Sequence, residues 1–501
     1  MLKSIFNYKL LIAVIVFIII FIRIPALTAR TIHIDEGMGI KASEQLLSGT
    51  YSYWPKNGHG PTLFYFGALI RKITGINIIF FRAITTIFML LALLILWLIY
   101  RRELNKAGEV LLLLGLGLSS GMLFFSAYFI HEALFILLTV FALAFAELWL
   151  KTKNGVWLTF FIIFASLMYM TKETALFTYA SWSIAVIIIL FWQKNLKYIL
   201  KQLISLKNII FIILGCIVSL ILYLIFFGKS LDLIIAPFFW LKERGLTMHI
   251  RPWYYFIILL SLHEFFLLII SIVAGTYITL KKMWEPRLAF FILWFLLILI
   301  AYSVIPYKTP WLIPNMILPL GLFMAFSVSV IWKKTDKVLL ASFIIILLII
   351  SLTGLLFDNI IHPDRSEKYD YAYLQSGIGF REFMAIIDGI SSLNKNETLP
   401  IQIIWGHGDE LLDVMTEKYS RQFKPFVPNM PLYINYFNSA EDMKKTLSQT
   451  DYEYVFLKFT YIINGPDIDI FIRKDKWDAY KNSPNFIKPQ SIWPDGTMRY
   501  Q

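Results

Sequence analysis

The chain has 501 residues, of which 58% are apolar, 17% aromatic and only 16% charged. Soluble domains carry nearer a quarter charged residues, so the composition excludes an ordinary soluble protein and indicates a polytopic membrane protein. The net charge of +13 would suit a nucleic-acid-binding protein, but the placement of the charges along the chain excludes that class.

Long charge-poor runs recur between residues 10 and 357, many of them close to the roughly 20 residues that cross a bilayer as a helix. Read in chain order, they predict about eleven spans, at residues 10–29, 77–100, 109–130, 133–150, 156–171, 175–192, 208–228, 254–280, 288–305, 311–332 and 338–357.

Basic residues gather on one side of these predicted spans. With the N-terminus inside, the short opposite-side turns carry little beyond Lys172 and Lys308. The positive-inside rule therefore predicts a multi-pass protein of the cell membrane with a cytoplasmic N-terminus and an extracytoplasmic C-terminal domain. The cytoplasmic segments then hold Lys3, Lys9, Arg101, Arg102, Lys106, Lys151, Lys153, Lys194, Lys197, Lys201, Lys207, Lys281, Lys282, Arg287, Lys333, Lys334 and Lys337.

The first span has an alternative interpretation as a secretory signal peptide. Lys3 and Lys9 precede a short apolar core, and Ala29 ends a plausible cleavage region. We favour a retained span, because cleavage would leave Asp35 near a free N-terminus without the helix that holds it. The single cysteine, Cys216, lies in a predicted span and forms no intrachain disulfide.

The predicted bundle of residues 1–357 has two long outside loops, 30–76 and 229–253, which are rich in Trp, Tyr and Pro. Loops of this length in a compact bundle are usually functional. Within the first loop, residues 60–72 are too short to span and end in basic residues. They predict an amphipathic helix along the membrane interface, begun by Pro61.

Charged residues return from residue 358 onwards, which predicts a small extracytoplasmic soluble α/β domain at 358–501. An amphipathic helix is expected near 380–392, and strand-like runs lie at 401–405 and 454–458. The predicted fold is therefore an α-helical polytopic membrane bundle followed by a small α/β domain.

Two adjacent carboxylates, Asp35 and Glu36, follow the first span beside His33, where the chain has just left the bilayer. Acidic side chains at a membrane surface are well placed for acid/base chemistry or for holding a cation. The alternative is structural, because acids at a helix N-terminus also stabilise the helix dipole.

Further ionisable residues fall at the outer ends of the predicted spans, where each is a functional candidate. A lipid-phosphate donor needs cations to neutralise the leaving phosphate, a carboxylate base for the acceptor, and lateral access for its tail. The candidates for these roles are Glu132 among the acids, with His59, His131, Lys172, His249, Arg251, Tyr307 and Lys308 for substrate or phosphate binding.

Several candidates have structural alternatives. Glu132 is also suited to cap the start of the fourth span, Lys172 to pair locally with Glu173, and Lys308 to extend toward lipid headgroups. The remaining expectations concern residues inside spans: a satisfied core pair at His263-Glu264, and interface-seeking side chains at Arg23 and Arg82.

Six segments in this order resemble the GT-C superfamily of lipid-dependent glycosyltransferases, especially its protein O-mannosyltransferase and aminoarabinose-transferase branch. The resemblance is closest to the archaeal and bacterial flippase-activity-associated protein family. The segments are His33-Ile-Asp-Glu36, His59-Gly-Pro61, Thr171-Lys-Glu-Thr174, Arg251-Pro-Trp-Tyr-Tyr255, Ile305-Pro-Tyr-Lys-Thr-Pro-Trp311 and Tyr371-Ala-Tyr-Leu-Gln-Ser376.

The resemblance implies a GT-C-like bundle that takes a sugar from a polyprenyl- or dolichyl-phosphate donor on the outer face. It implies an active site at the acidic pair, with Asp35 as the base, and an acidic residue at the end of span three that matches Glu132. Many relatives carry arginines just before that acid, where this chain has Ala127 and His131. This departure moves the expected phosphate contacts towards Lys308, Arg251 and His59.

We expect an inverting hexosyltransferase that transfers a hexose such as mannose to a glycan, lipid or protein acceptor. Some relatives need a divalent cation, and here His33, Asp35, Glu36, His131 and Glu132 offer nitrogen and oxygen ligands without a diagnostic spacing. We expect no obligatory metal. The alternatives are a flippase or flippase accessory for lipid-linked saccharides, and a non-catalytic scaffold.

Overall fold

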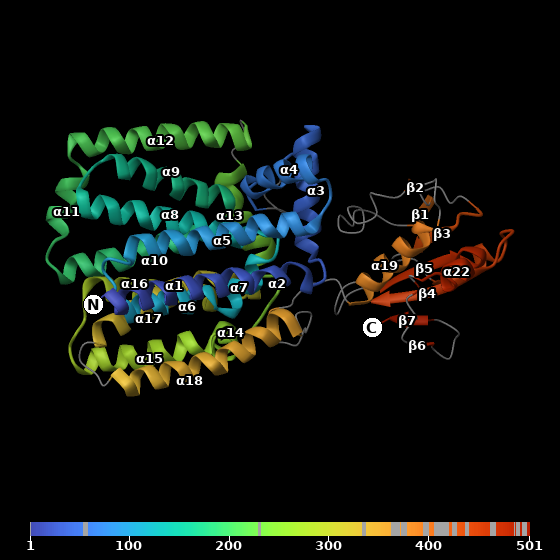
Figure 1. The fold of residues 1–501 in the computed structure, drawn as a ribbon. Helices are drawn as coiled ribbons and strands as arrows, with labels where there is room; N and C mark the ends of the chain where they lie inside the picture. Colours follow the sequence, from blue (N-terminus) through green and yellow to red (C-terminus); the bar gives the residue numbers. More distant parts are fainter. Residues whose placement is uncertain are drawn as a thin grey trace. The chain divides into compact units, whose positions relative to one another are not determined.

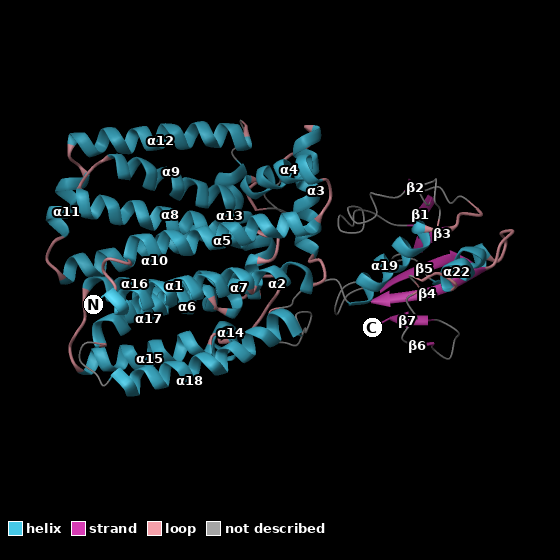
Figure 2. Ribbon diagram, viewed as in Figure 1, coloured by secondary structure: helices cyan, strands magenta, loops and turns pink. Residues whose placement is uncertain are grey.

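The computed structural model describes residues 2–53, 59–228, 232–332, 337–361, 371, 378–393, 400–404, 420–422, 428–435, 440–460, 467–484, 486, 491–492 and 498–500. The chain divides into two units. The bundle comprises Met1–Ala29 and Ser43–Tyr371, and the sheet unit comprises Arg30–Ala42 and Ala372–Gln501. Helices make up the bundle, whereas the strands belong to the sheet unit (Figure 2).

Apolar helices run side by side through the bundle, with α11 at one end and α4 and α13 at the other (Figure 1). Helix α3 (Ile34–Ser48) belongs partly to each unit. The remaining bundle elements are α1 (Leu2–Phe21), α2 (Arg23–Ala29), α4 (Thr62–Thr74), α5 (Ile78–Tyr100), α6 (Lys106–Gly117), α7 (Ser120–Ser126), α8 (His131–Thr152), α9 (Val156–Thr171), α10 (Ala175–Trp192), α11 (Leu196–Leu203), α12 (Leu206–Phe227), α13 (Asp232–Trp240), η1 (Leu241–Gly245), α14 (Tyr255–His263), α15 (Phe265–Leu280), α16 (Pro286–Val304), η2 (Pro310–Leu312), α17 (Pro314–Ile331), α18 (Lys337–Leu356) and η3 (Phe357–Ile361).

Among the described residues, eight helices are long and apolar enough to cross a membrane, or up to ten if two bent pairs each count as one span. Apolar helices occupy every predicted span. Helix α9 fills the span predicted at 156–171, and its 16 residues make it a shorter apolar helix. The predicted total of about eleven is reached only if each bent pair counts as one span and α9 is included.

Two predicted spans are not continuous helices. The chain bends by 48° between α6 and α7 and by 101° between α14 and α15. Polar groups hold both breaks, because Glu264 accepts hydrogen bonds from the Ser119 hydroxyl (3.0 Å), the Gly121 N–H (2.6 Å) and the Tyr371 hydroxyl (3.0 Å). The span predicted at 254–280 is therefore broken at Glu264.

The neighbouring pair His263-Glu264 is satisfied, as predicted. Its histidine Nδ1 lies 2.7 Å from a carboxylate oxygen of Asp358, and that carboxylate also accepts from the Ser120 hydroxyl at 3.1 Å. Residues 372–376, which follow Tyr371 in the sixth resembling segment, lie outside the described residues.

The prediction that Arg23 and Arg82 extend to the interface was wrong, because both are buried, at 2% and 1% exposure. Arg23 donates to the carbonyls of Ile19 (2.7 Å) and Gly117 (2.9 Å), and Arg82 donates to that of Leu27 (3.0 Å). Helical carbonyls near a break or an end are available as acceptors, so a buried guanidinium finds partners without reaching water.

The loop helix predicted within residues 60–72 is confirmed as α4, which begins directly after Pro61. Its apolar face includes the buried residues Leu63 and Phe64, while Arg71 and Lys72 occupy its last turn. The second long loop contains α13 and the π-helical turn η1.

The sheet unit is a mixed α/β structure, as predicted. In the described residues its seven strands have the order β2-β1-β3-β5-β4-β7-β6. Strands β1 and β4 confirm the runs expected at 401–405 and 454–458, except that Trp405 lies outside the described residues, and α19 confirms the helix expected near 380–392. The elements are α19 (Ile378–Ser392), β1 (Pro400–Ile404), β2 (Ser420–Gln422), β3 (Leu432–Asn435), α21 (Ala440–Leu447), β4 (Tyr454–Thr460), β5 (Asp467–Arg473), α22 (Lys474–Lys481), β6 (Ser491–Ile492) and β7 (Met498–Tyr500).

Candidate functional site

The acidic pair opens helix α3. The backbone N–H of His33 donates to Oε2 of Glu36 at 2.8 Å, so the third helical residue caps the residue before the helix. Glu36 is fully buried, whereas the side chain of Asp35 is 43% exposed. The two adjacent acids therefore differ: Glu36 holds the helix end, and Asp35 presents a carboxylate to the outside of its unit.

The His33 ring also helps to fix this turn. Its Nδ1 accepts the backbone N–H of Asp35 at 3.0 Å, which places the proton of the neutral ring on Nε2. The same Nδ1 lies 3.9 Å from a carboxylate oxygen of Asp35, too far for a hydrogen bond. The Asp35 side chain is thus positioned by its backbone while its oxygens remain exposed.

Within the bundle, Lys172 and Glu132 form a buried ion pair, with side chains that are 2% and 3% exposed. Glu132 lies in the first turn of α8, and Lys172 follows the last turn of α9. Each charge is therefore opposite in sign to the partial charge of the dipole at its helix end, which stabilises both side chains there. The predicted ion pair of Lys172 with Glu173 is not the one that forms, because the packing of α8 against α9 brings Glu132 to Lys172 instead.

Glu173 contacts His59 instead, with 3.0 Å between Oε2 and the ring Nδ1. Burial acts to raise the pKa of Glu173, but His59 and Lys172 outweigh it and hold the pKa below its usual range. The other carboxylate oxygen, Oε1, is buried with no hydrogen-bond partner in the described part of the chain. Glu173 is the site residue that our sequence-based set lacked, although it stood next to the lysine that was chosen.

Gly60 brings the first outside loop against the end of α9. Its N–H donates to the Thr171 carbonyl at 3.1 Å, and its own carbonyl lies 3.0 Å from Nε2 of His131. A Cβ at this position would stand 1.6 Å from the carbonyl oxygen of Met170. Only glycine permits this approach, which seats the His59 ring 5.0 Å from that of His131.

A second group forms where the second long loop meets the segment after α16. Ile250 and Tyr307 make an antiparallel bridge, the Arg251 N–H donates to the Pro306 carbonyl (3.1 Å), and the Lys308 N–H donates to the His249 carbonyl (3.0 Å). His249 has a φ of +50°, a left-handed conformation that the bridge holds in place. Strained backbone of this kind often lies at functional sites.

Two cations of this group have distinct surroundings. Lys308 is 2% exposed and donates through Nζ to the carbonyl of Ile305 at 2.5 Å. Burial lowers the pKa of Lys308 below its usual value. The Arg251 guanidinium lies 5.6 Å from the centre of the Tyr255 ring, within range of a cation–π contact.

Aromatic rings connect the two groups. Tyr302, near the end of α16, contacts Phe177 at the start of α10 (5.5 Å between ring centres) and Phe256 at the start of α14 (6.0 Å). Helix α10 follows Glu173, and α14 follows Arg251. The structure therefore brings eight predicted residues of the bundle to the same end of its helices: His59, His131, Glu132, Lys172, His249, Arg251, Tyr307 and Lys308.

Asp35 and Glu132 belong to different units, so the approach of these two carboxylates stays a prediction. Among the described residues, no group of three or more His, Cys, Asp and Glu side chains has a geometry that could hold a metal ion.

Comparison with known proteins adds to this geometry. Residues 58–223 match the family described as dolichyl-phosphate-mannose-protein mannosyltransferase. The fold is similar to ArnT from Cupriavidus metallidurans bound to undecaprenyl phosphate, with a TM-score of 0.61, 11% identity, and coverage of 92% of this chain and 97% of that one. The chain therefore shares the fold of this ArnT.

The apo state of the same ArnT gives a TM-score of 0.62 at 10% identity, over 92% of this chain and 98% of that one. No curated protein sequence matches the chain. The matched family region, 58–223, begins one residue before His59 and includes His131, Glu132, Lys172 and Glu173. The apolar helices make this a multi-pass membrane protein, and the candidate residues around the Lys172–Glu132 pair lie inside the matched region.

Proposed function

We propose that this protein transfers a sugar from a polyprenyl- or dolichyl-phosphate donor to an acceptor on the outer face of the cell membrane. The observation that carries the proposal is the gathering of acidic and basic side chains from five separate connections between helices at one end of the bundle. The description of the family matched at 58–223 supports a hexose such as mannose. The undecaprenyl phosphate in the related structure supports a polyprenyl carrier.

The donor side of the reaction requires positive charge where the lipid phosphate leaves. Lys308, Arg251 and His59 would supply it, since they come from three different loops at that end of the bundle. Charge-assisted hydrogen bonds to phosphate strengthen as charge develops on the leaving oxygen, so these contacts favour the transition state over the bound donor. Lys172 contributes less directly, because Glu132 already balances its charge.

The acceptor side requires a base, and Asp35 is the better of the two adjacent acids. Its side chain is 43% exposed, whereas the carboxylate of Glu36 caps its own helix. Asp35 would remove the proton from the acceptor hydroxyl or amide as that atom attacks the anomeric carbon. The sugar–phosphate bond breaks on the opposite face, so the anomeric configuration inverts and the lipid phosphate departs.

The test is transfer of labelled sugar from a polyprenyl-phosphate hexose by membranes that contain the native chain or Asp35→Asn. We expect the variant to lose about 10²–10⁴-fold in rate, the usual contribution of a positioned general base. Asp478→Asn is the matched control, because Asp478 is a comparably exposed acid (53%) of the same unit. Equal transfer by native chain and Asp35→Asn would remove Asp35 from the mechanism.

One observation favours a second candidate, a flippase for lipid-linked saccharides. Transporters often use discontinuous helices, and this bundle has two bent pairs joined through Glu264. If the chain moves lipid-linked sugars, Glu264→Gln in proteoliposomes should slow the exposure of a labelled lipid-linked saccharide on the opposite leaflet. Absence of sugar transfer by the native chain across several donors, combined with such movement, would favour this candidate over the enzyme.

A further inference from the structure

A groove with a volume of about 940 Å³ opens between α1, α5 and α6, at the bundle end opposite the candidate site. Most of its lining is aliphatic, contributed by residues such as Ile12, Val16, Leu90 and Leu94. Val16 and Leu94 are 38% and 45% exposed, so the groove is open laterally to the bilayer. An acyl chain can therefore enter it from the side.

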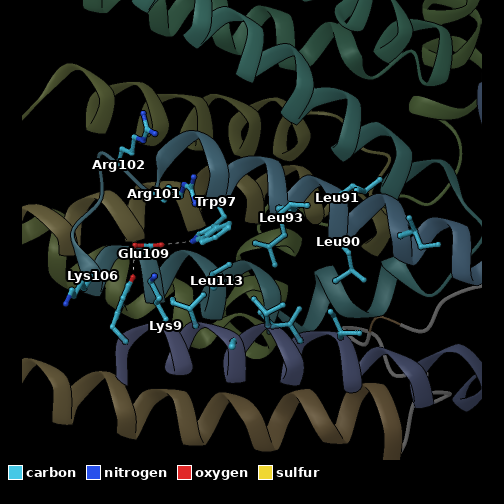
Figure 3. A pocket seen from close by; sticks show the side chains of 18 residues that line it. Lys9, Leu90, Leu91, Leu93, Trp97, Arg101, Arg102, Lys106, Glu109 and Leu113 are labelled. Carbon is cyan, nitrogen blue, oxygen red and sulfur yellow. Dashed lines mark hydrogen bonds between the residues drawn. The ribbon is translucent and has the colours of Figure 1, made fainter. Parts of the chain in front are cut away.

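Four cations lie at one end of this groove: Lys9, Arg101, Arg102 and Lys106. Figure 3 shows them gathered at that end, while Leu90 and Leu91 lie towards the other. The nearby carboxylate of Glu103 is bound elsewhere, by Lys151 and Arg287. None of the four cations forms an ion pair with any residue that the structure describes.

One acid, Glu109, also lines the groove, and its two oxygens already have partners. Oε2 accepts from the Tyr8 hydroxyl and Oε1 from the Trp97 ring N–H, both at 2.6 Å. These bonds tie α1 and α5 to the start of α6 and fix the wall of the groove. The lining therefore carries four positive side chains against one negative one, which leaves an excess of three positive charges for a ligand.

The dimensions fit one leaflet of a membrane. The groove follows α5 from Ile87 to the helix end at Tyr100, about 20 Å at 1.5 Å per residue, and continues to Arg101 and Arg102 in the next turn. Half of a bilayer, including its headgroup region, is about 20–22 Å thick. An apolar channel of this length with cations at one end matches a lipid whose tail lies along the helix and whose headgroup is anionic.

We propose that this groove binds an anionic diacyl phospholipid of the surrounding leaflet. The phosphate lies against Arg101 and Arg102, whose planar guanidiniums suit phosphate oxygens, and the other two cations complete the positive surface. An acyl chain packs along α5 between α1 and α6. Basic sites between helices at a membrane surface recognise anionic headgroups in this way, and the positive-inside distribution assigns the site to the cytoplasmic leaflet.

The first experiment measures retention of phosphatidylglycerol by the full-length chain in a neutral detergent, using native mass spectrometry, with phosphatidylcholine as the neutral comparison. Each juxtamembrane cation contributes about fivefold in affinity, so Arg101→Gln with Arg102→Gln should weaken phosphatidylglycerol retention about 25-fold. The matched control is Lys197→Gln with Lys201→Gln, which removes two exposed charges from α11 outside the groove. Equal losses in the two double variants would reduce the proposal to non-specific attraction and overturn it.

A second pair of variants tests the apolar channel without changing any charge. Val16→Trp fills the groove, whereas Val186→Trp places the same ring on an equally exposed face of α10 (42% against 38%). We expect only the first to weaken phosphatidylglycerol retention, by tenfold or more, about the effect of a lost acyl-chain contact. Retention unchanged by Val16→Trp would show that the lipid does not occupy the groove.

Two measurements on the native chain keep the proposal testable if variants misfold. Phosphatidylglycerol with a photoreactive tail should crosslink mainly to α1 and α5, and even labelling of all lipid-facing helices would overturn the proposal. Excess inorganic phosphate should not displace the lipid. Displacement would mean that the cations bind free phosphate and that the channel has no part in recognition.

Discussion

The buried ion pair of Lys172 and Glu132 provides a quantitative test of the first group of site residues. Both side chains are at most 3% exposed, so removing one partner leaves an uncompensated charge in the protein interior. Such a loss costs about 3–5 kcal/mol of folding free energy. Replacing both residues removes both charges, and exchanges of this kind are often nearly neutral. We therefore expect Lys172→Met and Glu132→Gln to be strongly destabilising singly and much less so together.

The assay is thermal unfolding of the detergent-purified chain at neutral pH, for the native protein, the two single variants and the double variant. An exposed pair, Lys444 and Glu441, is the control, since its glutamate side chain is 81% exposed and its loss should cost at most about 1 kcal/mol. In the expected order of stability, the double variant lies close to the native chain and both single variants lie far below.

The opposite outcome has a clear meaning. If the single variants lost less than about 1 kcal/mol and their effects simply added in the double variant, the pair would not stabilise the junction of α8 and α9. A stable Glu132→Gln chain that had lost sugar transfer would instead assign Glu132 a role in the reaction, as the resemblance implies.

Three further predictions concern other residues of the bundle. Gly60→Ala should destabilise the chain by about 1–3 kcal/mol, because the added methyl overlaps backbone at the end of α9. The control is Gly354→Ala, which meets nothing within 4 Å and should stabilise the chain by about 0.5–1 kcal/mol. Thermal unfolding midpoints compare the two variants. The lowered pKa of Glu173 predicts a contribution to folding stability that is complete above about pH 4.5 and is lost as the pH falls through the lowered pKa. Glu173→Gln should therefore flatten the acid side of the curve of stability against pH. An unchanged curve would contradict this. Tyr371→Phe removes a hydroxyl donor from buried Glu264 and should cost about 1–3 kcal/mol in the same unfolding assay; a neutral effect would show that this bond contributes nothing.

Hydropathy predicted the positions of the spans because each is a local property of about 20 residues. It could not predict the break at Glu264, since one polar residue hardly changes the average of an otherwise apolar run. The hydrogen-bond donors that stabilise this break come from Gly121 in α7 and from Tyr371, which are distant in sequence.

The sequence predicted which residues gather in the candidate site better than it predicted which residues they contact. Ionisable residues at span ends are costly to keep, so their presence alone pointed to Lys172 and Lys308. The partner of Lys172 lies 40 residues away and is supplied by helix packing, and the partner of Glu173 lies 114 residues away. No local pattern specifies contacts across such separations. The roles of Asp35 and the other site residues in a reaction remain predictions.

The bond between Arg23 and the Gly117 carbonyl imposes an order on how this protein is built in the membrane. Arg23 leaves the ribosome 94 residues before Gly117, so the first span enters the bilayer with only the Ile19 carbonyl, of these two acceptors, in place for the guanidinium, and an incompletely paired charge in a span is costly. Helix α6 relieves that cost when it arrives, and the absence of a side chain at Gly117 lets Ile19 approach closely enough to bring the two helices together. During synthesis, α1 therefore reaches its final position in the bilayer only after α6 has been inserted.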